Sequence, residues 1–127
     1  MKILLDTHML IWSAAGELPN KAVKYIEDKS NTLLFSSASI WEVAIKQGLG
    51  RADFNVDPTA LYNGLLMAGY KELPIIGQHT LLVLTLPPLH KDPFDRILIA
   101  QSISEEIPLL TSDKRLLDYH NSVIYIA

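Results

Sequence analysis

The chain has 127 residues, of which 49% are hydrophobic, a formal net charge of −3 and no cysteine. This length and apolar content predict a single domain, residues 1–127, with a substantial core, and exclude a disordered protein. The lack of cysteine excludes disulfides and thiolate zinc sites, and the acidic balance argues against non-specific binding to nucleic acid. The longest apolar stretch, Leu81–Leu86, is too short to span a bilayer, and no signal peptide is visible, so we expect a soluble cytoplasmic protein.

Strands and helices are predicted to alternate along the chain, which is typical of an α/β fold. A strand at about 2–6 precedes a helix at 7–15, and a helix at 20–29 precedes a strand at 32–35. A helix capped by Ser37 runs to 47, and the pair Asp57-Pro58 starts another to 68. A short strand at 72–75 and a helix at 78–84 follow. The pair Asp92-Pro93 starts a helix to 105, and then come a strand at 107–111, a helix at 114–119 and an edge strand at 122–126.

Two acids, Asp6 and Asp113, follow the short apolar runs 3–5 and 108–111, which are typical of buried parallel strands. The carboxyl ends of such strands line one edge of the sheet, where ligands bind. Together with Glu42 and Asp95, these acids predict a cluster of carboxylates that repel one another unless a cation joins them. Hard oxygen ligands select Mg²⁺ or Mn²⁺. The pattern therefore indicates a metal-dependent enzyme that acts on phosphate.

Each acid also has a purely structural interpretation. Asp6 and Asp113 fit helix N-caps, and Glu42 fits a solvated helix face with Lys46 four residues on. Their joint placement still favours a site, because right-handed crossovers bring the ends of the first and fourth strands to the same edge.

Asp92 and Asp95 flank the start of the helix at 93–105. Capping is expected to be the main role of Asp92, whereas Asp95 in the first turn is directed toward the sheet edge and is assigned to metal binding. His90 is a candidate for substrate contact. Of the aromatic residues, Trp12 and Trp41 are expected to be core or interface anchors rather than platforms for base stacking.

Three rival functions fit the same residues less well. An aspartate-dependent phosphatase needs a second acid two residues after its nucleophile, and His8 stands there. A serine hydrolase is disfavoured because no Gly-x-Ser-x-Gly motif is present. A non-catalytic binding module, such as a receiver or an RNA-binding scaffold, would not need all the acids that this chain keeps.

Four stretches resemble the PIN-domain family and, within it, VapC-like toxins of toxin–antitoxin pairs. The most specific is His90–Gln101 with its His-x-Asp-Pro-Phe-Asp-Arg run, followed by Leu110–Asp113; Ile3–His8 and Ser37–Glu42 also match. The resemblance implies a three-layer α/β/α fold around a mostly parallel sheet of about five strands. It also implies an endoribonuclease that uses Mg²⁺ or Mn²⁺, a homodimer and a small antitoxin partner. A non-toxin PIN nuclease and a non-catalytic PIN scaffold remain alternatives.

The resemblance assigns metal binding to Asp6, Glu42, Asp95 and Asp113, and Asp92 matches an additional acid of the toxin subgroup. The expected reaction is hydrolysis of an RNA phosphodiester, in which the metal makes hydroxide available near neutral pH. Candidate contacts to RNA phosphates are Arg96, Ser112 and Lys114, and His90 is a candidate for another contact to the substrate.

Overall fold

The computed structural model describes residues 1–126 and contains a five-stranded sheet in the order β3-β2-β1-β4-β5. Its strands are β1 (Lys2–Leu5), β2 (Thr32–Ser36), β3 (Lys71–Leu73), β4 (Leu109–Thr111) and β5 (Val123–Tyr125). All four neighbouring pairs are parallel. The predicted α/β class and parallel sheet are confirmed, with β5 at an edge as expected.

The helices agree with the predicted order, with small shifts at their ends. They are α1 (Thr7–Ala15), α2 (Asn20–Glu27), α3 (Ser37–Gly48), α4 (Pro58–Met67), α5 (Gly77–Leu82) and α6 (Pro93–Glu105), with two 3₁₀ segments, η1 (Val83–Thr85) and η2 (Lys114–Tyr119). One predicted cap is wrong. The Ser36 hydroxyl, and not Ser37, accepts from the Ala38 N–H and caps α3.

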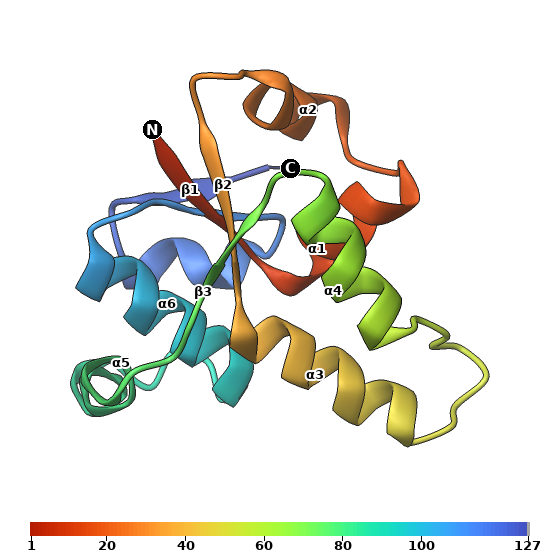
Figure 1. The fold of residues 1–127 in the computed structure, drawn as a ribbon. Helices are drawn as coiled ribbons and strands as arrows, with labels where there is room; N and C mark the ends of the chain where they lie inside the picture. Colours follow the sequence, from red (N-terminus) through yellow and green to blue (C-terminus); the bar gives the residue numbers. More distant parts are fainter. Residues whose placement is uncertain (127) are drawn as a thin grey trace.

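The core lies on both faces of the sheet, because side chains alternate along each strand. Ile3 and Leu5 of β1 belong to a core cluster that includes residues of α1, α2, α3 and α4. Leu4 between them belongs to a second cluster, formed with α6 and η2. Figure 1 shows the same three layers, with α5 and α6 on one side of the sheet and α1 and α4 on the other.

The carboxyl ends of β1, β2 and β4 coincide. Leu5 is in register with Phe35 and with Leu110, so the three strands finish side by side. The Asp6 N–H then donates to the Leu110 carbonyl at 3.0 Å, which fixes the first residue after β1 against β4. Within residues 1–126, no helix is long and apolar enough to cross a bilayer.

The two tryptophans have different environments. Trp12 is half-buried against the first core cluster. Trp41 on α3 is 60% exposed and contacts Phe94 edge-on, with ring centroids 5.3 Å apart. Of the two predicted roles, a core position is therefore wrong for Trp41, which instead lines an exposed, mainly apolar cavity with Val83 and Phe94.

Candidate active site

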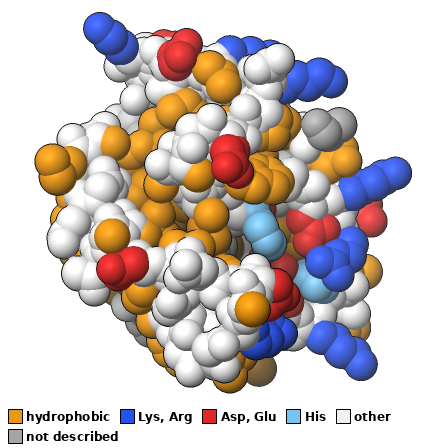
Figure 2. Space-filling view, turned by 90° about the vertical axis from the view of Figure 1, so that its right-hand side faces the viewer, with side chains coloured by type: hydrophobic (Ala, Val, Ile, Leu, Met, Phe, Trp, Pro, Cys, Tyr) orange, Lys and Arg blue, Asp and Glu red, His pale blue; other side chains and the backbone are white. Residues whose placement is uncertain are grey.

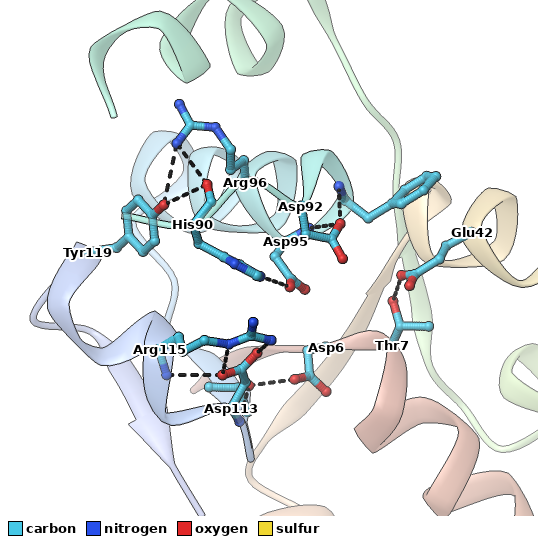
Figure 3. A network of polar contacts seen from close by, with 12 residues as sticks. Asp6, Thr7, Glu42, His90, Asp92, Asp95, Arg96, Asp113, Arg115 and Tyr119 are labelled. Carbon is cyan, nitrogen blue, oxygen red and sulfur yellow. Dashed lines mark hydrogen bonds and ion pairs between the residues drawn. The ribbon is translucent and has the colours of Figure 1, made fainter. Parts of the chain in front are cut away.

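A small cavity of about 80 Å³ lies at the carboxyl edge of the sheet and is lined by all five predicted metal-binding acids. These acids reach it from the ends of β1 and β4 and from α3 and α6, as Figure 3 shows. A larger cavity of about 550 Å³ between α1 and α4 has mainly apolar walls. The smaller cavity is therefore the better candidate for the active site, because its walls carry ionisable side chains. The acid cavity is lined by Asp6, Thr7, His8, Glu42, Lys46, Asp92, Asp95, Asp113 and Arg115.

Asp6 is buried and is both a helix cap and a member of the site. Its Oδ1 accepts from the Met9 N–H at 2.9 Å, which caps α1, and its Oδ2 accepts from the Thr111 hydroxyl at 2.5 Å. Burial raises the pKa of this carboxyl above its ordinary value, although the two hydrogen bonds oppose the shift. Charge at Asp6 is therefore costly, and a neighbouring cation would stabilise it.

Glu42 does not lie on a solvated helix face, so that interpretation is wrong. Glu42 is only 4% exposed, because α3 directs its side chain toward the sheet edge. The Thr7 hydroxyl donates to Glu42 Oε1 at 2.7 Å, and Lys46 Nζ lies 2.6 Å from Oε2. The predicted pairing of Glu42 with Lys46 is present, but the Glu42 carboxylate is buried at the cavity.

Asp92 and Asp95, at the start of α6, have different contacts. Asp92 Oδ1 accepts from the N–H groups of Phe94 and Asp95, at 2.8 and 3.4 Å, so the expected N-cap is confirmed. Asp95 Oδ2 lies 2.7 Å from His90 Nε2. Burial raises the pKa of Asp95 to about 6, and the nearby charges of Asp92 and Glu42 add to the shift.

Asp113 is held by Arg115, a contact that was not predicted. The Arg115 guanidinium donates to both carboxylate oxygens, at 3.0 and 2.8 Å, and the Arg115 backbone N–H donates to Oδ1. These hydrogen bonds lower the pKa of Asp113, so on acidification this acid keeps its charge to a lower pH than Asp95.

The residues present suit a divalent cation. One nitrogen of His90 and one oxygen each of Asp95 and Asp113 lie within 4.8 Å of one another. Carboxylate oxygens with a single imidazole suit Mn²⁺ as well as Mg²⁺. The cavity holds five acids against the two fixed cations Lys46 and Arg115, so it has a surplus of negative charge that a metal ion would offset.

The three predicted phosphate contacts lie elsewhere. Ser112 and Lys114 are not among the residues that line the acid cavity. The Arg96 guanidinium donates to the carbonyls of Val83, Pro87 and His90, with N–O distances of 3.0 to 3.3 Å. It therefore ties the segment before α6 to that helix.

Sequence reasoning missed Thr7 and His8 as residues of the cavity wall, and it offered Lys46 and Arg115 only as two of several cations near the acids. Two signals were available. Thr7 and His8 begin α1 directly after Asp6, and Lys46 lies one helical turn beyond Glu42. Arg115 carried no comparable signal, because its position depends on how η2 turns after Asp113.

Residues 3–121 match the PIN domain family, and the chain belongs to that family. No curated protein sequence matches the chain significantly.

Solved structures share the fold at low sequence identity. VapBC2 from Rickettsia felis, bound to a DNA fragment from its promoter, is 16% identical with a TM-score of 0.72, over 97% of this chain and 96% of that chain. DNA-bound VapBC from Salmonella typhimurium is 13% identical with a TM-score of 0.67, over 99% and 97%. VapBC-1 from nontypeable Haemophilus influenzae is 18% identical with a TM-score of 0.62, over 94% and 96%.

Proposed function

We propose that this chain is an endoribonuclease that depends on Mg²⁺ or Mn²⁺ and acts as the toxin of a toxin–antitoxin pair. One observation carries the proposal. Five carboxylates from four distant segments converge on one small cavity at the sheet edge. Family membership supports a nuclease in general, because the PIN domains of VapC proteins are nucleases.

In the proposed site, Asp6, Asp95 and Asp113 hold the metal ion and Glu42 assists. A divalent cation bound there lowers the pKa of water and withdraws charge from the phosphoryl oxygens. Thr7 and Thr111 orient two of the carboxylates, since each hydroxyl donates to one carboxylate oxygen. A site built mainly of carboxylates favours direct attack by water over the metal-free route through the 2′-hydroxyl, so we expect 5′-phosphate and 3′-hydroxyl ends.

Lys46 and Arg115 are proposed to have two roles, neutralising acids when no metal is bound and binding RNA phosphate when it is. Each neutralises one acid in the absence of metal, Glu42 and Asp113 respectively. Both reach the cavity from outside, with 34% and 65% of their side chains exposed. With the acids bound to a metal ion, the Lys46 amine and the Arg115 guanidinium would be free to bind an RNA phosphate by charge.

The proposed partners follow from the same fold. An antitoxin would bring an Arg or Lys to the acid cavity, because a cation can replace the metal there. Its apolar anchors would dock near Trp12 and Leu18, which are partly buried against the first core cluster. A homodimer is proposed through the exposed apolar surface at Trp41. We also propose a cytoplasmic location, where the cellular RNA pool is found.

Cleavage of end-labelled RNA with and without EDTA tests the proposed activity. We expect cleavage to stop in EDTA and to return with Mg²⁺ or Mn²⁺, with product ends that carry 5′-phosphate. Asp95→Asn should abolish cleavage, whereas Asp118→Asn, an exposed acid outside the cavity, should not. Undiminished cleavage in EDTA by protein freed of contaminating nucleases, or 2′,3′-cyclic phosphate ends, would contradict the metal-dependent mechanism. RNA binding without cleavage would favour a scaffold instead.

A further inference from the structure

A second cavity, of about 250 Å³, adjoins the acid cavity and has no part in the chemistry described above. We call it the side cavity; it lies among α1, α3 and the loop between α3 and α4. Thr7, His8 and Lys46 line both cavities, so the two lie side by side. Figure 2 shows that acidic, basic and histidine side chains gather on one face of the molecule, directly beside apolar ones.

The walls of the side cavity are apolar. Ile11 comes from α1, Val43 from α3, and Phe54 and Val56 from the loop. All four pack with the first core cluster, which holds these walls in place. The volume lies below the roughly 300–1,000 Å³ of pockets that bind drug-sized ligands. The side cavity therefore suits one planar ring system, bound by stacking and apolar contact.

The rim of the side cavity is polar and is fixed by Gln47. Gln47 Oε1 accepts from the Val56 N–H at 2.9 Å, and its Nε2 donates to Asn55 Oδ1 at 3.3 Å. Within residues 1–126, the Asn55 amide nitrogen donates no hydrogen bond, so it remains available to a ligand. Together with exposed His8 and Asp53, it places donors and acceptors where the edge of a ring would lie.

Lys46 stands between the two cavities. Its amine lies 2.6 Å from Glu42 Oε2 and lines both spaces. A ligand that places a phosphate at the acids and a planar group in the side cavity would therefore pass a cation between them. A nucleotide has this layout, because a short sugar joins its phosphate to its base.

We propose that the side cavity binds a nucleobase next to the scissile phosphate of the RNA, and that Asn55 helps to select that base. The inference rests on the proposed nuclease function and names a part of its substrate that the acids do not contact. Base stacking on apolar and aromatic walls tolerates several bases, whereas the Asn55 amide distinguishes them by hydrogen bonding.

The test uses the full chain and a synthetic RNA oligonucleotide that contains a mapped cleavage site. Each base near the cut is removed in turn by an abasic substitution, and kcat/KM is measured. We expect one abasic position to lower kcat/KM at least about fivefold, as the loss of one stacked base predicts. Asn55→Ala should reduce the discrimination among the four bases at that position and leave other positions unchanged. Asn63→Ala, an exposed asparagine of α4 outside the cavity, is the matched control.

A binding measurement separates this inference from the proposed activity. NMR spectra in EDTA follow the Asn55 side-chain amide and the methyl groups of Ile11 and Val56 during titration with the oligonucleotide. Shifts with the intact strand but not with the abasic one support the side cavity, even if no cleavage is detected and the proposed function fails. Cleavage that is indifferent to every abasic position overturns the nucleobase site and leaves the nuclease standing. RNA that shifts the NMR signals of other residues only would also overturn the nucleobase site. An antitoxin side chain bound in the side cavity, with base discrimination unchanged by Asn55→Ala, would overturn it as well.

Discussion

At the scale of single residues, the acids of the site differ in what stabilises their charge. Asp113 has Arg115 on both oxygens, and its pKa is lowered. Asp95 is more deeply placed, contacts His90 and has its pKa raised to about 6 by burial. The negative charge of Asp95 therefore costs free energy, and acids with a pKa perturbed in this way are common at functional sites.

Asp95→Asn should change how stability depends on pH. Since burial raises the pKa of Asp95 from 3.8 to about 6, the folded protein binds more protons than the unfolded one between these values. The free energy of unfolding in EDTA should therefore fall as pH rises from 4 to 6, by about 2 kcal/mol from this group, and then level off. Asp95→Asn should flatten that fall, as measured by urea unfolding across pH. An equal slope in the variant would contradict the assignment, and Asp118→Asn should keep the wild-type slope.

Arg115→Gln should tighten metal binding. The variant removes a cation that competes for Asp113, so the affinity for Mn²⁺ should rise by up to about fivefold, the range expected for a largely exposed ion pair. Isothermal titration calorimetry measures this without any turnover. Lys114→Gln removes the same charge from the adjacent exposed residue and should have a smaller effect. Weaker binding in Arg115→Gln would show that Arg115 supports the site through the fold.

The sequence was sufficient to bring Asp6, Asp95 and Asp113 together, because strand ends and helix starts obey strong rules of chain connection. Glu42 lies inside α3, and its place at the site rested on the family resemblance. It was not sufficient for the contacts among side chains. The direction of Arg96 depends on the path of residues 83–90, which has no periodic pattern. Arg115 likewise depends on the short η2 turn.

At the scale of whole elements, capping residues determine where the helices of the site begin. Asp57 and Asp92 each precede a proline and accept hydrogen bonds from the next turn, in α4 and α6 respectively. Both starts were predictable, because an acid before proline is a strong local signal. The start of α3 was misplaced by one residue, since Ser36 and Ser37 are equally good caps in sequence and only the end of β2 decides between them.

Replacing the two capping acids by asparagine should separate capping from site chemistry. Asparagine caps about as well as aspartate, so Asp57→Asn and Asp92→Asn should each change the free energy of unfolding by less than about 0.5 kcal/mol. Only Asp92 lines the acid cavity, so only Asp92→Asn should slow RNA cleavage. Thermal melts and cleavage rates measured on the same samples check both parts. Equal activity in both variants would limit Asp92 to capping.

At the scale of the whole molecule, a cavity of about 500 Å³ between α3, α5, η1 and α6 has exposed apolar walls. Trp41, which is 60% exposed, lines it together with Ile75, Val83, Phe94 and Ile97. Exposed apolar groups of this size, gathered together, are typical of protein–protein interfaces rather than of a free surface. The cavity includes Phe94 at the start of α6, so a second copy bound here would lie close to Asp95.

The proposed homodimer can be tested at Trp41. A glutamate placed at this exposed position should not disturb the core, but it would place a charge in the interface. We expect light scattering to report a dimer for the wild type and a monomer for Trp41→Glu at the same concentration. Met67→Glu, at an exposed residue of α4 that is 89% accessible, is the control and should remain dimeric. A wild-type monomer at all concentrations would contradict the proposal.

The position of β1 in the sheet has a consequence for the time at which the site forms. β1 lies between β2 and β4. Its residue Leu4 pairs with Leu34 of β2 on one side and with Leu109 of β4 on the other, and Leu109 is more than a hundred residues from Leu4 along the chain. Contacts of such sequence separation form late and slow the folding of a chain. Asp113 follows β4, so a growing polypeptide on the ribosome has its first two acids long before the others. The proposed nuclease is therefore inert through most of its own synthesis, which leaves an interval in which an antitoxin already present can meet the emerging fold.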